Sequence, residues 1–213
     1  MKKWLRIPLI IILAVLTILI FNEPGPVWFF PIFLIAYLFK DKLSRLENLK
    51  PRLIIKYVIF GVLIGLIIEM FAIIASQSIP IGQRALFHQE PIPDLILAIG
   101  YYAMLMLGSY IMLRRYNYSL KQIFILGGIF GVILEQHGGV LLSIFEGNIL
   151  GGIYVFLSYS SLIALPYLVF QKGFNKFKRK ETIWKYLISL LILIGFYLLF
   201  LGYFLIVNPI VSS

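Results

Sequence analysis

Residues 53–75 read LIIKYVIFGVLIGLIIEMFAIIA, an almost unbroken apolar run whose only charged residues are Lys56 and Glu69. A helix needs about 20 such residues to cross a hydrocarbon core of about 30 Å. This segment is therefore long enough to cross a bilayer as one helix. The whole chain is similar in character, since 61% of its 213 residues are hydrophobic and 13% are charged, against about 25% charged in soluble domains. Such a composition excludes a soluble globular protein and a disordered chain.

Apolar segments of similar length recur along the chain and predict about seven membrane spans. They cover residues 5–22, 26–39, 53–75, 94–113, 122–145, 149–170 and 184–207. We expect the first span to be retained rather than removed as a signal peptide, because no small-residue cleavage site follows it. The second is short, so it either crosses a thinned bilayer or forms half of a re-entrant hairpin. The predicted fold is an all-α polytopic transmembrane helical bundle, a single integral membrane domain over residues 1–213.

The basic residues indicate how this bundle is oriented. If the N-terminus is inside and all seven spans cross, every lysine and arginine except Arg84 falls on the inner side. Cytoplasmic loops of membrane proteins are enriched in these two residue types. We therefore predict an inside N-terminus, an outside C-terminus and a multi-pass location in the cell (cytoplasmic) membrane.

The net charge of +10 has an explanation that does not involve nucleic acid. Basic loops beside the inner leaflet attract anionic lipid head groups. Residues 172–180, KGFNKFKRK, are interpreted as such a loop rather than as an RNA-binding tail. Membrane lipids are thus the expected partners, and a homo-oligomer or a protein partner is left open. The absence of cysteine excludes disulfides, thiolate metal sites and cysteine nucleophiles.

Two of the spans share a motif of two glycines and a glutamate at four-residue intervals. The first copy is Gly61, Gly65 and Glu69, and the second, 66 residues later, is Gly127, Gly131 and Glu135. Residues four apart lie on one helix face, and small residues in this register let membrane helices approach closely. We assign the four glycines to helix packing. The repeat also suggests a duplicated helical hairpin, spans three and four against spans five and six, although the second helices of the pairs match poorly.

The two glutamates are the main functional candidates. At 1.5 Å per residue both lie roughly 20 Å from the inner boundary, in the outer third of the bilayer. A carboxyl group in the hydrocarbon zone is costly and marks a functional site by default. A structural hydrogen bond between helices is the alternative for each of them.

Polar residues gather on the predicted outer side, where all acidic residues except Asp41, Glu47 and Glu181 lie at the surface or in the outer third of the bilayer. The simplest functional interpretation is an acidic cavity that opens outward and attracts cations or amines. The residues expected to relay protons or to act as acid and base are Glu69, Glu135 and His137. The residues expected to contact a substrate are His88, Glu90 and Glu146, the last standing above Glu135 on the same helix face.

Two further interpretations concern single residues. Asp94 follows two prolines and is expected to cap the helix that begins there. No metal site is predicted, because no spacing such as His-Glu-x-x-His is present. A zinc site formed by His88, His137, Glu69 and Glu135 stays a minor alternative, and any cofactor is unknown.

Three functions remain open from the sequence. The first is a small-solute or cation transporter, coupled to protons through the intramembrane glutamates. The second is a membrane-embedded enzyme that acts on a lipid-linked or external substrate with a Glu/His site near the outer interface. The third is a non-catalytic membrane subunit or assembly factor, so whether the chain is an enzyme is left undecided.

Overall fold

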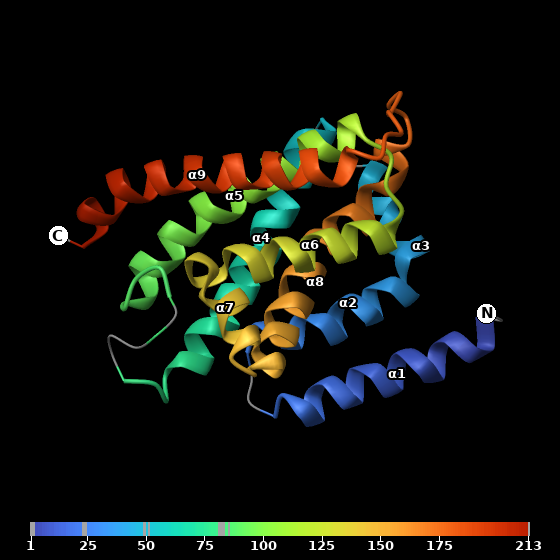
Figure 1. Cartoon of the computed structure of the whole chain (residues 1–213). Coiled ribbons are helices and arrows are strands. Elements are labelled where there is room, and N and C mark those ends of the chain that lie inside the picture. The colour runs from blue at the N-terminus through green and yellow to red at the C-terminus, as the bar shows by residue number, and fades with distance from the viewer. Residues whose placement is uncertain are drawn as a thin grey trace.

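The computed structural model describes residues 3–22, 25–48, 50, 52–80, 84 and 86–212, and in this part of the chain it contains helices and no β-strand. The α-helices are α1 (Lys3–Ile20), α2 (Phe29–Leu38), α3 (Lys40–Leu43), α4 (Leu53–Ser76), α5 (Pro91–Arg115), α6 (Leu120–Leu134), α7 (Gly139–Phe145), α8 (Ile149–Phe174) and α9 (Lys185–Val211). Short 3-10 helices occupy Pro26–Trp28, Ser44–Asn48 and Glu135–Gly138. The predicted all-α class is confirmed (Figure 1).

Five of the described helical segments are long and apolar enough to cross a membrane. They are Leu53–Ser76, Pro91–Arg115, Leu120–Phe145, Ile149–Phe174 and Lys185–Val211. The apolar stretches Ile7–Ile20 and Pro26–Leu38 are shorter. Many leucines and isoleucines are exposed on the outside of the bundle, as a lipid-facing surface requires. The chain is therefore compatible with a multi-pass membrane protein, whereas seven crossings and the inside-to-outside orientation stay predictions.

The helices form two packed pairs, α4 with α5 and α6 with α8, and α9 covers α5 (Figure 1). The glycine motif makes the same kind of contact in both pairs. A Cβ added at Gly61 or Gly65 would collide with Met106 or Tyr102, and one added at Gly127 or Gly131 would meet Ile163 or Tyr159. At each of these glycines, atoms of the neighbouring helix lie within 3.4 Å of the position that a Cβ would take, and the packing role assigned to them stays a prediction. Each pair brings a tyrosine ring onto the second glycine and an aliphatic side chain onto the first.

The expectation of one continuous helix over residues 122–145 is wrong, because the helix is interrupted in its middle. The helix α6 ends at Leu134, and α7 begins at Gly139 after an irregular segment. Gln136 and His137 have left-handed backbone angles, with φ of 51° and 55°, which an α-helix cannot contain. The break ends the face that was expected to continue from Glu135, and Glu146 at the end of α7 is exposed.

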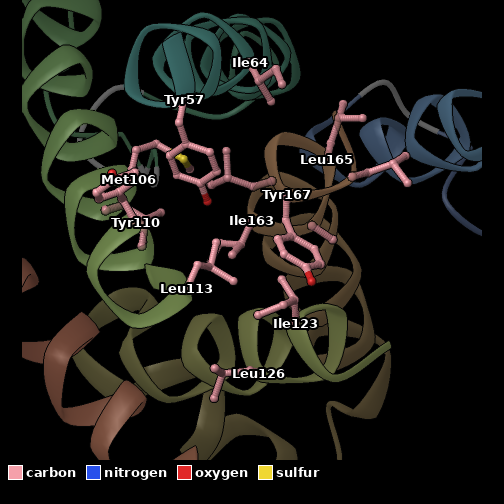
Figure 2. Close-up of a cluster of buried hydrophobic side chains, with 14 of the residues drawn as sticks. Tyr57, Ile64, Met106, Tyr110, Leu113, Ile123, Leu126, Ile163, Leu165 and Tyr167 are labelled. Carbon is pink, nitrogen blue, oxygen red and sulfur yellow. The ribbon is translucent and has the colours of Figure 1, made fainter. Parts of the chain in front are cut away.

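One end of the bundle is closed by a dense aromatic and aliphatic core. Figure 2 shows Tyr57 of α4, Met106 of α5, Ile123 of α6 and Tyr167 of α8 meeting in this core. All four side chains are completely buried. This is the end at which α4 and α6 begin and α5 and α8 finish, and it carries most of the basic residues. We call it the basic end.

A buried lysine forms hydrogen bonds with the loops that connect the helices at the basic end. Lys185, the first residue of α9, is only 5% exposed, and its Nζ donates to the backbone oxygen of Asn117 and to Glu181 Oε2, both at 2.8 Å. The adjacent lysine lowers the pKa of Glu181. Tyr118 donates to the Lys185 carbonyl at 2.8 Å, and burial raises the pKa of Tyr118 to about 12, so this hydroxyl keeps its proton at neutral pH. The start of α9 is thereby fixed to the connection between α5 and α6.

The close glycine contacts can be tested by adding one methyl group. Gly65→Ala and Gly131→Ala force the rings of Tyr102 and Tyr159 to move, and overpacking of this kind costs about 1–3 kcal/mol. We expect both variants in detergent to unfold at a temperature several degrees lower than the wild type in a thermal scan. Gly195→Ala is the control, because nothing lies within 4 Å of the added carbon. Equal unfolding temperatures for all three variants would contradict the packing role.

Candidate functional site

A cavity of about 640 Å³ lies at the end of the bundle opposite the basic end. Residues of α4, α5, α7, α8 and α9, and of the irregular segment after α6, line it. Its size falls within the range of about 300–1,000 Å³ that is usual for small-molecule sites. The lining residues with polar or aromatic side chains that matter below are Glu69, Phe87, Tyr101, Tyr102, Glu135, His137, Tyr154, Tyr159, Tyr197, Phe200 and Phe204.

Glu69 enters the cavity from α4. Glu69 is only 6% exposed, and its Oε2 accepts a hydrogen bond of 2.7 Å from the hydroxyl of Tyr102 on α5. The ring of Tyr102 reaches this position because it packs on Gly65, one helical turn before the glutamate. The glycine and the glutamate of the motif therefore act on the same tyrosine, one by leaving space for its ring and one by accepting from its hydroxyl.

Glu135 has the same arrangement at the end of α6. Its Oε2 accepts a hydrogen bond of 2.6 Å from Tyr159 on α8, and the ring of Tyr159 packs on Gly131. The hydroxyls of Tyr101 and Tyr159 lie 2.7 Å apart. Because Tyr159 gives its one hydroxyl proton to Glu135, Tyr101 is the donor in this second bond. A chain of two hydrogen bonds thus leads from α5 to the glutamate.

Both glutamates line the same cavity. The rings of Tyr101 and Tyr102, which serve different glutamates, touch edge to face with centroids 5.1 Å apart. The two Glu–Tyr pairs are therefore parts of one site and not of two separate helix interfaces.

His137 also lines the cavity, on the irregular segment after Glu135. The residue is exposed, and its Nδ1 lies 3.2 Å from the hydroxyl of Tyr197 on α9. Left-handed angles at Gln136 and His137 are strained for residues other than glycine. Irregular backbone at membrane depth is tolerated where it lines a cavity or is buried in protein, and strain of this kind concentrates at functional sites.

Among the described residues, the cavity is lined by acidic groups and by no lysine or arginine. The ion pair found in the described part of the chain, Lys185 with Glu181, is at the basic end. Asp94 adds a third acid beside Glu69. It is completely buried, and its Oδ2 has no hydrogen-bond partner among the described residues.

The expected capping role of Asp94 takes a different form. The cap position of α5 is held by Glu90, and Asp94 lies one turn inside the helix. Its Oδ1 accepts from the backbone N–H of His88 at 3.0 Å, so the carboxylate fixes the preceding loop instead of the helix end.

The three residues expected to contact a substrate are not among the lining residues of the cavity. Glu90 and Glu146 are exposed. His88 accepts from the Glu90 backbone through Nδ1 at 3.0 Å and meets Ser212 through Nε2 at 3.2 Å. The zinc alternative is not formed either, since no group of three or more acidic or histidine residues in the described segments is arranged to hold a metal ion.

The tyrosines of the site are not among the residues that the sequence patterns predict. Tyr101, Tyr102 and Tyr159 belong to none of the motifs described above. One signal was present: Tyr102, Met106 and Tyr110 recur as Tyr159, Ile163 and Tyr167 at an offset of 57 residues. The glycine motif has an offset of 66, so the two halves of the repeat can be aligned only with a gap of nine residues between them.

The left-handed backbone after α6 can be tested by placing glycine and valine at two positions where their effects on stability should be opposite. At Gln136 the left-handed angles favour glycine and penalise a β-branched residue, by about 1–2 kcal/mol for a left-handed non-glycine residue. We expect Gln136→Gly to unfold at a higher temperature than Gln136→Val. At Ile129, an exposed residue within α6, the order reverses, because glycine destabilises a helix interior. The same order at both positions would show that residue 136 is helical.

No family model matches the chain, and no curated protein or solved structure resembles it. Its function therefore has to be inferred from the cavity, where two glutamates, each hydrogen-bonded by a tyrosine, meet without a basic counter-charge.

Proposed function

We propose that the protein is a proton-coupled transporter of a small solute in the cytoplasmic membrane, with its N-terminus inside and its cavity open to the outside. The observation that carries this proposal is the pair of glutamates, Glu69 and Glu135, at the wall of one cavity whose described lining contains no lysine or arginine. Anionic lipid head groups at the basic end are the expected lipid contacts.

Protons provide the coupling in this proposal. A carboxylate without a counter-charge is costly inside a membrane, so a glutamate that has neither a proton nor a cationic partner is disfavoured. The tyrosine hydroxyls offer each carboxylate one strong hydrogen bond, which makes the charged form accessible without making it permanent. Each glutamate can thus alternate between carrying a proton and facing a solute.

The arrangement of the helices supports a transporter built from two repeated helical hairpins. We propose that α4–α5 and α6–α8 are the two copies of a duplicated hairpin, because the Gly–Gly–Glu motif and its tyrosine partner are repeated with the same contacts. Transporters are often built from two repeats, including parallel ones, with the substrate site at their interface. The cavity lies where the two pairs meet.

A membrane-embedded enzyme is the second candidate, and the closed basic end favours it. Tyr57 and Tyr167 are completely buried in the packed core of the basic end (Figure 2), and an enzyme needs access from only one side. In that case Glu135, with Tyr159 and His137 nearby, would act as acid and base. A transporter needs in addition a second conformation in which the packed end opens. The two candidates differ in whether the solute emerges unchanged on the far side.

The test uses proteoliposomes with a pH-sensitive dye inside. Benzyltrimethylammonium, glucose, alanine and benzenesulfonate are added outside in turn, and the rate of proton movement is recorded together with the chemical identity of the solute recovered inside. We expect at least one solute to drive proton movement, and Glu69→Gln and Glu135→Gln to reduce that rate more than tenfold.

Glu146→Gln is the matched control, because it removes the same charge at an exposed position outside the cavity. It is expected to keep the wild-type rate. Full proton movement in both cavity variants would contradict the proposed function, and a solute converted chemically without crossing the membrane would favour the enzyme.

A further inference from the structure

We infer that the solute is a monovalent organic cation with an apolar body, held between Glu69 and Glu135 and exchanged for a proton. This inference rests on the proposed function in that it names the transported species. The binding site itself can be tested without transport.

The charge of the cavity selects against anions. Two glutamates line it, a third acid lies beside Glu69, and the lining residues that the structure describes include no lysine or arginine. An anion would be repelled by this wall, whereas a cation supplies the counter-charge that the buried carboxylates lack. Asp94, which is buried beside Glu69, adds a further acidic group on this side of the cavity.

The serine hydroxyls of the wall are not free donors for a solute. Three serines line the cavity, but each donates its hydroxyl proton to a backbone oxygen of its own helix. Ser76 bonds to Ile73 at 2.8 Å, Ser143 to Val140 at 2.9 Å and Ser158 to Tyr154 at 2.8 Å. The amide side chains in the wall are those of Gln136 and Asn148, so a solute that relies on serine hydroxyls finds no free partner among the described residues.

Aromatic rings form much of the remaining wall. The aromatic lining residues other than His137 are Phe87, Tyr101, Tyr102, Tyr154, Tyr159, Tyr197, Phe200 and Phe204. The rings of Phe87 and Tyr101 lie 5.2 Å apart between centroids, and those of Tyr101 and Phe200 lie 5.1 Å apart. Aromatic faces attract organic ammonium groups, and cages of such rings are the usual recognition element for them. The rings would also pack against the apolar body of the ligand.

The size of the cavity favours an organic cation over a metal ion. A metal ion needs several oxygen or nitrogen ligands within about 2.0–2.6 Å, and no group of three or more acidic or histidine residues in the described segments is arranged in that way. A volume of about 640 Å³ is instead suited to a molecule with an aromatic or branched apolar part.

Exchange with a proton follows from the groups that face the two glutamates. Glu69 faces Tyr102 and Asp94 from α5 and Glu135 across the cavity. Glu135 faces Tyr159 from α8 and His137 on its own segment. None of these neighbours is a permanent cation, so the departing ligand leaves a negative charge that a proton neutralises. Ligand and proton therefore compete for the same carboxylates.

The experiment measures binding by calorimetry, with the full-length protein in lipid nanodiscs. The probes are benzyltrimethylammonium, the neutral benzyl alcohol and the anionic benzenesulfonate. We expect benzyltrimethylammonium to bind at pH 8 and to bind at least tenfold more weakly at pH 5, while the other two probes give no saturable binding. Equal binding of the neutral or the anionic probe, or no binding of the cation, would overturn the inference.

Variants locate the site. Glu69→Gln and Glu135→Gln are expected to weaken binding of the cation at least tenfold at pH 8, and Glu146→Gln to leave it unchanged. Tyr197→Leu removes one aromatic ring from the wall of the cavity and no charge. It provides a second test if a glutamate variant fails to fold. Wild-type affinity in folded Glu69→Gln and Glu135→Gln, or in folded Tyr197→Leu, would place the cation elsewhere.

The two proposals can fail separately. If a neutral solute or an acid drives proton movement through Glu69 and Glu135, transport stands and the organic cation is wrong. If benzyltrimethylammonium binds as described but neither it nor a proton crosses the membrane, the cation site stands and the transport function is wrong.

Discussion

The hydrogen bond between a tyrosine hydroxyl and a glutamate carboxyl, made twice, is the interaction on which the rest of the site depends. Tyr102 serves Glu69 and Tyr159 serves Glu135. An acid within a membrane needs a polar partner because the surrounding lipid offers none. In each pair the glycine one turn earlier leaves the space through which the tyrosine ring reaches the acid. Packing and chemistry are thus specified by the same short motif.

The two halves of the bundle have different properties. At the basic end, tyrosine and phenylalanine rings fill the space between the helices, and Lys185 fixes the start of α9 to the connection before α6. At the opposite end, the irregular segment that follows α6 and residues of α7 line the cavity. A solute could enter the acidic cavity from one side of the bundle. A transport cycle would in addition require the packed aromatic core of the basic end to open.

Much of the fold follows from the sequence because apolar runs and helix ends are local signals. Each of the seven segments is largely helical in the structure, although the fifth is interrupted after Leu134, and Ser119 with Gln122 forms a capping box before α6. The break at Gln136 and His137 could not be predicted, because residues with a Cβ rarely adopt left-handed angles. The depth and spacing of the two glutamates in the sequence made them candidates. Their tyrosine partners depend on which helices pair, and this pairing is hard to recognise in the sequence because the glycine motif and the tyrosines repeat at different offsets.

The central claim is that Glu69 and Glu135 reach water from the outside through one cavity. Because the chain has no cysteine, Glu69→Cys and Glu135→Cys can each be treated in intact cells with a charged thiol reagent that does not cross membranes. The account predicts that both react from outside, while Leu198→Cys on the outward, lipid-facing side of α9 does not. Reaction only from the inside, or no reaction at either glutamate position, would contradict it.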